Sequence, residues 1–201
     1  MIAILDYDMG NVASIKNMLE HIGFEAMITH DFEQLSKASQ LILPGVGSFD
    51  HGVNSLKERG LFDYLKQSNK PILGICLGMQ LLGNQSEEGN EKGLELIDFD
   101  NVKFKFEDQK LKVPHMGWND VKVKKIKNPI LKDISSKDRF YFVHSYHAKP
   151  KDDNLEILST SYGYDFTSAV NYKNVYGVQF HPEKSHQFGM KILKNFGEIH
   201  A

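Results

Sequence analysis

A single cysteine enclosed by glycines, between an apolar run and a helix-compatible segment, constrains the fold of this chain more than any other feature. Residues 71–73 (Pro-Ile-Leu) lead into residues 74–78 (Gly-Ile-Cys-Leu-Gly), and residues 79–82 (Met-Gln-Leu-Leu) follow. A strand, a tight turn and then a helix form a nucleophile elbow, here with sulfur in place of the usual serine oxygen. Glycines suit such a strained turn because no Cβ crowds the nucleophile from either side.

The position of Cys76 favours a reactive thiolate. The sulfur would lie at the N-terminus of the following helix, where exposed backbone N–H groups and the helix dipole stabilise negative charge. A lone free cysteine is more often buried and inert. The flanking glycines and the strand-helix context favour the catalytic interpretation of Cys76.

A second motif, residues 178–183 (Val-Gln-Phe-His-Pro-Glu), supplies a base. In an extended segment the side chains of His181 and Glu183 would project to the same face. Glu183 would then accept the imidazole N–H and fix the tautomer of His181. The motif alone is equally typical of a strand that runs into a capped helix. Paired with Cys76, it predicts a triad of nucleophile, base and orienting carboxylate in the order Cys76, His181, Glu183.

A third motif, residues 41–47 (Leu-Ile-Leu-Pro-Gly-Val-Gly), is an apolar strand that ends in a glycine-rich turn. We expect the N–H of Leu77 and a donor from the turn formed by Gly45, Val46 and Gly47 to hold an oxyanion. A phosphate-binding loop is excluded because the last glycine of the G-x-G-x-x-G pattern is missing and Asp50 would repel an anion.

The spacing of apolar runs predicts the fold class and its division into elements. Alternating strand and helix patterns predict a mostly parallel α/β sheet in three layers, with helices on both faces and the active site outside the carboxyl ends of the strands. We expect one domain over residues 1–201. The expected strands are residues 2–5, 26–29, 41–43, 72–75, 140–144, 156–159, 167–171 and 175–180. The expected helices are residues 12–21, 55–67 and 187–196, with a polar loop at 85–92 and a solvated strand and turn at 122–127.

Composition bears on which kinds of partner, and which cellular compartment, are expected for this chain. The 24 basic and 26 acidic residues nearly balance, so neither a nucleic-acid nor a membrane partner is expected. The apolar start is interrupted by Asp6 and Asp8, which argues against a signal or membrane-spanning segment. A chain with one cysteine forms no internal disulfide, in agreement with a reducing compartment, and the cytoplasm is expected.

The three motifs, in this order, resemble the triad-type (class I) glutamine amidotransferases. Four further segments resemble the glutaminase subunits of imidazole glycerol phosphate synthases within that family. They are residues 6–11, 44–49, 113–119 and 181–185. The resemblance runs from Ile2 to about Phe196 and implies a flavodoxin-like mixed sheet.

The resemblance implies L-glutamine as substrate, hydrolysed through a γ-glutamyl thioester, with no cofactor and no metal. Gln80 and Glu88 match positions that hold the α-amino and α-carboxyl ends of glutamine. Ser145 and Tyr146 match positions whose backbone contacts the substrate. Taken by itself, Glu88 is an ordinary acidic loop residue.

A partner is expected because nothing in the sequence could use the ammonia released. The resemblance implies a (β/α)₈ barrel subunit, joined in a heterodimer, that consumes ammonia in histidine biosynthesis. Trp118 is the candidate interface anchor, since aromatic residues are enriched at interfaces, and the alternative is a core tryptophan. Asn11 and Lys184 match further family positions that face the partner.

Two departures from the family pattern leave the ammonia acceptor open. Asp8 stands where the family usually has glycine, and residues 83–85 replace a more usual apolar-acidic stretch. Residues 165–168 and 184–189 resemble paralogues that feed ammonia to a sugar-modifying amidotransferase of surface-polysaccharide synthesis. A non-catalytic binding scaffold and a thiol hydrolase acting on esters are weaker alternatives, because the triad is intact and Gln80 suits an amino-acid amide.

Overall fold

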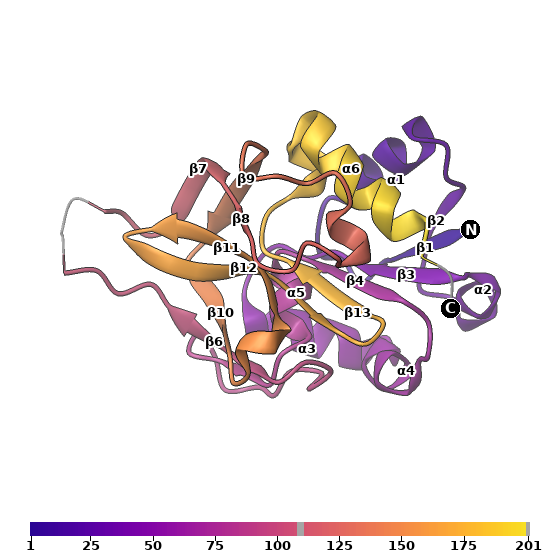
Figure 1. The fold of residues 1–201 in the computed structure, drawn as a ribbon. Coiled ribbons are helices and arrows are strands. Elements are labelled where there is room, and N and C mark those ends of the chain that lie inside the picture. The colour runs from indigo at the N-terminus through magenta and orange to yellow at the C-terminus, as the bar shows by residue number, and fades with distance from the viewer. Residues whose placement is uncertain (108–110, 200–201) are drawn as a thin grey trace.

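The computed structural model describes residues 1–107 and 111–199, and its first half alternates strands with helices (Figure 1). The elements of this half are β1 (Ile2–Leu5), α1 (Val12–His21), β2 (Ala26–Thr29), α2 (Phe32–Lys37), β3 (Gln40–Leu43), α3 (Phe49–Glu58), α4 (Leu61–Gln67), β4 (Ile72–Ile75) and α5 (Leu77–Leu81). The second half is mostly extended. Its elements are β5 (Gln85–Ser86), β6 (Phe99–Lys103), β7 (His115–Asp120), β8 (Lys122–Val123), β9 (Arg139–His144), β10 (Tyr146–Pro150), β11 (Glu156–Tyr162), β12 (Tyr164–Tyr172), β13 (Val175–Val178) and α6 (His186–Gly197).

The parallel part of the sheet has the strand order β2-β1-β3-β4-β13 within the described residues. This is the flavodoxin-like order, with β13 as the fifth strand. β13 lies beside β4, with Gly177 opposite Gly74, although β13 is nearly the last element in the sequence. The predicted three-layer α/β class is confirmed.

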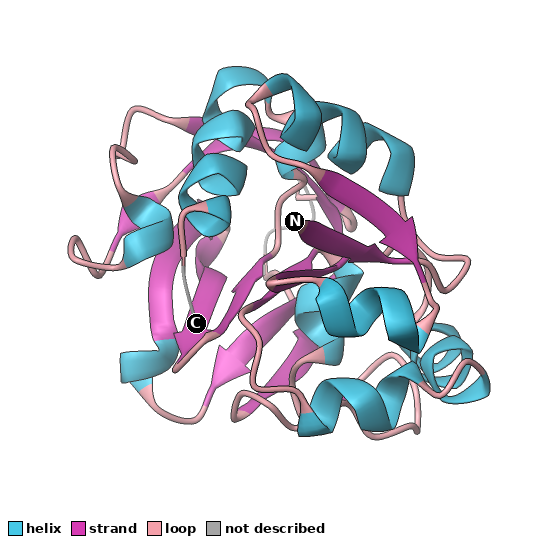
Figure 2. Cartoon of the chain, turned by 90° about the vertical axis from the view of Figure 1, so that its right-hand side faces the viewer, coloured by secondary structure: helices cyan, strands magenta, loops and turns pink. Residues whose placement is uncertain are grey.

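Side-chain alternation along each strand separates two apolar cores. Ile2 and Ile4 of β1 face a core completed by α1 and α6. Ala3 and Leu5 face the opposite core, completed by α2, α3, α4 and α5. Figure 2 shows helices on both sides of the strands. Burial of both faces explains why the parallel strands read as continuous apolar runs.

The other part of the sheet is mostly antiparallel, apart from the parallel pair β5 and β6, and extends away from the two termini (Figure 1). β12 follows β13, and β10 and β6 continue the sheet, while β11 folds back on β12. In the described chain β7 and β9 form a separate two-stranded ribbon, with Trp118 opposite Tyr141 and His115 opposite His144. This ribbon carries side chains toward the reaction centre described below.

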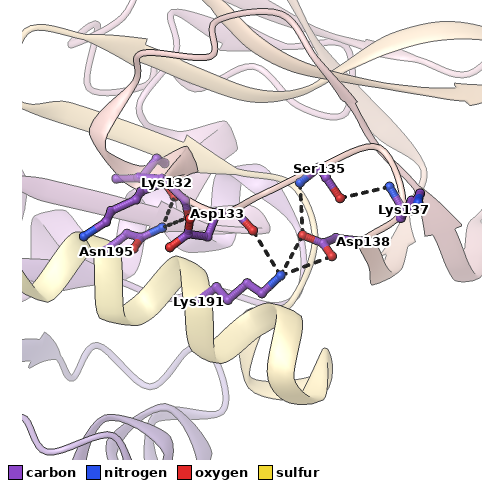
Figure 3. Close-up of polar contacts among 8 residues, drawn as sticks. Lys132, Asp133, Ser135, Lys137, Asp138, Lys191 and Asn195 are labelled. Carbon is purple, nitrogen blue, oxygen red and sulfur yellow. Dashed lines mark hydrogen bonds and ion pairs between the residues drawn. The ribbon is translucent and has the colours of Figure 1, made fainter.

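Polar contacts anchor α6 to the segment that precedes β9 (Figure 3). Lys191 Nζ donates to the carbonyl of Asp133 at 3.0 Å and pairs with the carboxylate of Asp138 at 3.1 Å. Asn195 Nδ2 donates to the carbonyls of Ile130 and Lys132 at 3.0 and 2.7 Å. These contacts hold in place the helix that directly follows the His-Pro-Glu motif.

Several sequence-based element boundaries need correction. The strands expected at 156–159 and 167–171 extend over Glu156–Tyr162 and Tyr164–Tyr172, and α2, β6, β7 and β10 were not expected. Residues 55–67 are not one helix, because Gly60, with φ of 68°, adopts a left-handed conformation and separates α3 from α4. The strand expected at 175–180 ends at Val178. The loop expected at 85–92 contains the short strand β5, which pairs with β6. No helix in the described part of the chain is both long and apolar enough to span a membrane.

Candidate active site

Cys76 occupies a strained turn between β4 and α5, as the elbow pattern predicts. Its φ of 54° and ψ of −110° lie outside the regions that ordinary residues favour. A Cβ on Gly78 would lie 1.9 Å from the carbonyl oxygen of Leu43, and one on Gly74 would lie 2.7 Å from that of Gly78. Only glycine therefore fits on either side of the elbow.

The three sequence motifs meet at the carboxyl ends of three neighbouring strands. The glycine-rich turn follows β3, Cys76 follows β4, and His181 follows β13. They enclose a cavity of about 290 Å³. Its lining includes Val46, Gly47, Cys76, Leu77, Gln80, Glu88, Ser145, Tyr146 and His181. The topology thus gathers residues that are far apart in the sequence.

His181 and Glu183 are hydrogen-bonded, but not through strand alternation. His181 Nδ1 donates to Glu183 Oε1 at 2.8 Å, and the side chains are only 1% and 2% exposed. The expectation of an extended segment is wrong, because Pro182–Lys184 form a 3₁₀ turn. Ser185 Oγ donates to the carbonyl of His181 at 2.6 Å and closes this turn. His181 Nε2 is buried and makes no hydrogen bond to the described residues, which leaves it available for proton transfer.

The surroundings of His181 favour its protonated form. Burial lowers the pKa of the imidazole, but its interactions with Cys76 and Glu183 outweigh this effect and raise the pKa to about 10. The site therefore favours an imidazolium at His181, which borders the same cavity as the sulfur of Cys76.

This raised pKa predicts how stability depends on pH. An ordinary imidazole has a pKa near 6.5, so the folded chain holds the His181 proton more tightly than the unfolded chain does. The stabilisation is complete below about pH 6.5 and is lost as the pH rises toward about 10. We expect the melting temperature of the parent to fall more steeply over this range than that of His181→Gln, measured by circular dichroism. If the melting temperatures of the parent and of His181→Gln fell equally with pH, His181 would not have a raised pKa in the folded chain.

One predicted oxyanion donor is occupied within the protein. The N–H of Leu77 donates to the carbonyl of Gly45 at 3.3 Å. The turn that carries Gly45, Val46 and Gly47 therefore presents a carbonyl, not an N–H, to this part of the elbow. Gly47 has φ of 112°, which allows the turn a backbone conformation that other residues resist.

Tyr7, which was not predicted as a site residue, contacts the residue that precedes this turn. Its hydroxyl donates to the carbonyl of Pro44, and its side chain is fully buried. Burial, and secondarily the charge of Cys76, raise the pKa of Tyr7 far above its ordinary value. The hydroxyl therefore remains a donor at physiological pH.

The four predicted substrate residues all line the cavity, and two are partly engaged by the protein. Gln80 Nε2 donates to the carbonyl of Tyr146 at 3.0 Å, and its side chain is buried. Glu88 Oε2 accepts from the N–H of Phe49 at 2.8 Å, which fixes the carboxylate at the cavity. Ser145 and Tyr146 follow β9 and border the cavity.

Two further side chains near the site were not predicted from the sequence. Gln179 Nε2 lies 3.7 Å from Cys76 Sγ as a hydrogen-bond donor. The Asp50 carboxylate accepts from the N–H groups of Asn90 and Glu91, each at 3.0 Å, and so anchors the loop that carries Glu88. The motif at 178–183 contains Gln179, but nothing in the sequence indicates that its amide turns toward the sulfur.

A larger cavity, of about 890 Å³, lies beside α6 and the residues drawn in Figure 3. Its lining includes Ile126, Lys132, Ser135 and Asn195 but none of the three triad residues. Among residues 1–107 and 111–199, no group of three or more His, Cys, Asp or Glu side chains is arranged to hold a metal ion. The smaller cavity at Cys76 is therefore the candidate active site.

The predicted interface residues are all accessible. Trp118 is 38% exposed, which excludes the core alternative, and its ring stacks on His186 with centroids 5.4 Å apart. Lys184 Nζ lies 5.7 Å above the ring of Tyr141, which packs edge-on against Trp118. Asn11 is exposed and caps α1 by accepting from the N–H of Ser14 at 3.3 Å.

Comparison with known proteins agrees with this geometry. The family model for class I glutamine amidotransferases matches residues 3–199. The chain is 58% identical to imidazole glycerol phosphate synthase subunit HisH 2 of Methanococcus maripaludis, over 98% of both chains. It is 50% identical to HisH 2 of Pseudomonas aeruginosa, over 99% of this chain and 100% of that protein. A crystal structure described as a glutamine amidotransferase superposes with a TM-score of 0.76 at 19% identity, covering 98% of this chain and 99% of that one. The chain therefore belongs to the class I glutamine amidotransferases and, within them, to the family of HisH glutaminase subunits of imidazole glycerol phosphate synthase.

Proposed function

We propose that Cys76, His181 and Glu183 hydrolyse L-glutamine to glutamate and ammonia, with residues 1–201 acting as one domain. The observation that carries this proposal is the convergence of the elbow, the His181–Glu183 pair and the glycine-rich turn on one cavity. Gln80, Glu88, Ser145 and Tyr146 border that cavity at positions suited to the amino-acid end of glutamine.

The reaction follows from the roles of these groups. The Cys76 thiolate attacks the side-chain carboxamide carbon of glutamine, and the carbonyl oxygen takes the negative charge. The His181 imidazolium gives its proton to the nitrogen, which leaves as ammonia when the carbon–nitrogen bond breaks. Water then attacks the thioester, with His181 accepting its proton, and glutamate departs as the thiolate is restored.

The oxyanion would be held by two backbone N–H groups after a change in the turn. The carbonyl of Gly45 must leave the N–H of Leu77, and the peptide between Gly45 and Val46 must turn its own N–H toward the cavity. One preorganised donor contributes a factor of about 10² to 10³ in rate. The resting hydrogen bond between Leu77 and Gly45 is therefore a barrier to catalysis that a partner could remove.

The ammonia would pass to a (β/α)₈ barrel subunit bound in a cytoplasmic heterodimer. The exposed Trp118, with Lys184 beside it, supports a docking surface on this side of the molecule. Asn11 lies just after Gly10, where a Cβ would meet the Pro44 side chain at 2.9 Å, so this residue too is close to the oxyanion turn. Docking over these residues would act directly on the turn.

The histidine-pathway intermediate is the acceptor favoured by the relatives' names, and a sugar-pathway acceptor is the alternative. Residues 165–168 and 184–189, which resemble the sugar-pathway paralogues, motivate this alternative. Restored growth without histidine, in a host that lacks its own HisH subunit but retains the barrel, would select the histidine pathway. Failure to restore growth by a chain that hydrolyses glutamine would select the alternative.

Covalent labelling tests the nucleophile. A glutamine-analogue electrophile such as diazo-oxo-norleucine should add once per chain, at Cys76, because only this side chain combines the elbow with a basic partner. Intact-mass and peptide mass spectrometry measure the stoichiometry and the position. Cys76→Ser, which preserves size, is the matched control and should remain unlabelled. Equal labelling of that variant would exclude Cys76 as the nucleophile.

A further inference from the structure

A line of buried hydrogen bonds begins on β7 and ends at the floor of the cavity. Asn119 Nδ2 lies 3.2 Å from His115 Nε2, and His115 Nδ1 lies 3.1 Å from His144 Nε2. His144 Nδ1 lies 2.8 Å from the carbonyl oxygen of Tyr146. His115 and His144 are only 3% and 6% exposed, so water does not compete for these contacts.

The direction of each bond follows from chemistry. A carbonyl oxygen only accepts, so His144 Nδ1 must carry the proton. Burial lowers the pKa of His144 well below its ordinary value, although the bond to Tyr146 opposes this, and burial lowers the pKa of His115 to about 4. In the neutral rings, Nε2 of His144 accepts from Nδ1–H of His115, and Nε2 of His115 accepts from Asn119.

The same carbonyl connects this line to the reacting sulfur. Gln80 Nε2 donates one hydrogen to the carbonyl of Tyr146 at 3.0 Å and the other to Gln179 Oε1 at 3.1 Å. Gln179 Nε2 then donates to Cys76 Sγ at 3.7 Å. Each donating nitrogen from β7 to the nucleophile therefore has an acceptor within the line.

We propose that His144 and His115 are positioning residues of the glutaminase reaction, which hold the Tyr146 carbonyl and thereby aim the amides of Gln80 and Gln179 at the substrate and the thiolate. The inference rests on the proposed function, because it concerns the rate of the same reaction. His144 acts by donating one hydrogen bond in a fixed tautomer, not by carrying charge or exchanging protons.

Three substitutions of His144 distinguish the contributions of its two ring nitrogens. Asparagine places an amide nitrogen where Nδ1 lies, glutamine places one where Nε2 lies, and phenylalanine preserves the ring without either. We expect His144→Asn to keep kcat/KM for glutamine within a fewfold of the parent. His144→Phe and His144→Gln should lower it roughly tenfold or more, because the Tyr146 carbonyl loses a buried donor. Glutamate production by the full chain, alone and with the barrel subunit, gives these values.

His147 offers a matched control within the same cluster. It is 7% exposed, its ring packs on Phe104 as the ring of His144 does, and its nitrogens bond to the Ala148 carbonyl and the Tyr164 hydroxyl, outside the line. His147→Phe should cost similar thermal stability but leave kcat/KM within about twofold. A loss equal to that of His144→Phe would assign both effects to packing and overturn the proposal.

A double-mutant cycle tests whether the line acts as a unit. Gln179→Leu removes the donor to the sulfur, so His144→Phe should lower kcat/KM much less in that background than in the parent. Additive losses would overturn the proposal.

Two-bond ¹H–¹⁵N spectra test the assigned tautomers. They should show both His144 and His115 with the proton on Nδ1, and Nε2–H tautomers would also overturn the proposal. A parent that hydrolyses no glutamine would remove the proposed function itself, whereas an active parent with equal variants would remove only this inference.

Discussion

Replacing His181 by alanine is expected to lower glutaminase activity about as far as removing the sulfur of Cys76. Triad members act as a unit, and losing either the nucleophile or the base costs roughly 10⁴ to 10⁶ in rate. In this structure no other described imidazole borders the sulfur in the protonated form, since the buried His144 is neutral. Steady-state glutamate production by His181→Ala and Cys76→Ala measures the loss, and melting curves verify that both variants fold.

Glu183→Gln should be less severe, with a loss of roughly 10² to 10⁴. The glutamine side chain can still accept the hydrogen bond from Nδ1 but carries no charge to stabilise the imidazolium. The raised pKa of His181 should fall in this variant, because the Glu183 charge is one of its causes. Turnover at the parental rate would show that another group orients His181.

The isolated chain is expected to hydrolyse glutamine slowly, and a barrel subunit with its acceptor bound should raise the rate by about 10² to 10³. The physical reason is the bond from Leu77 N–H to the Gly45 carbonyl, which removes one oxyanion donor in the chain alone. A partner that pulls the glycine-rich turn outward would release that donor and bring a second one. Steady-state assays with and without the partner measure the activation.

Trp118→Ala provides the control for this activation. Trp118 lies away from the cavity lining, so the variant should retain the slow activity of the isolated chain. It should lose part of the activation, through weaker binding or poorer transfer of ammonia. Full activity of the parent chain alone, unchanged by any partner, would instead describe an independent glutaminase.

The sequence predicts the parallel half of the fold well and the antiparallel half poorly, for a physical reason. β1 and β4 are buried on both faces and therefore read as unbroken apolar runs. Only His115 of β7 is buried, and the other residues alternate between exposed and half-buried positions. Because the inward positions are His115, Gly117 and Asn119, no apolar alternation predicts this strand. Its side chains are held by partners on β9 and β11, which the local sequence does not reveal.

The same distinction applies to the site. The grouping of Cys76, His181 and Glu183 could be predicted because nucleophilic catalysis requires particular residue types in recognisable motifs. The orientation of a peptide group cannot be predicted in this way, since Gly45 permits either direction and the choice depends on the neighbouring Leu77. The line through His115 and His144 likewise depends on β7 lying against β9, a pairing between distant parts of the chain.

The place of β13 in the sheet also bears on how the protein matures. β13 is the last strand among the described residues, yet it lies between β4 and β12 in the sheet. During synthesis the elbow leaves the ribosome long before its neighbouring strand, so the parallel and antiparallel halves of the sheet join only after β13 has been synthesised. His181 follows soon after β13, so the predicted catalytic base is synthesised together with the strand that closes the sheet. Nascent and truncated chains that carry Cys76 consequently lack the base needed to release ammonia before a folded subunit exists to deliver it.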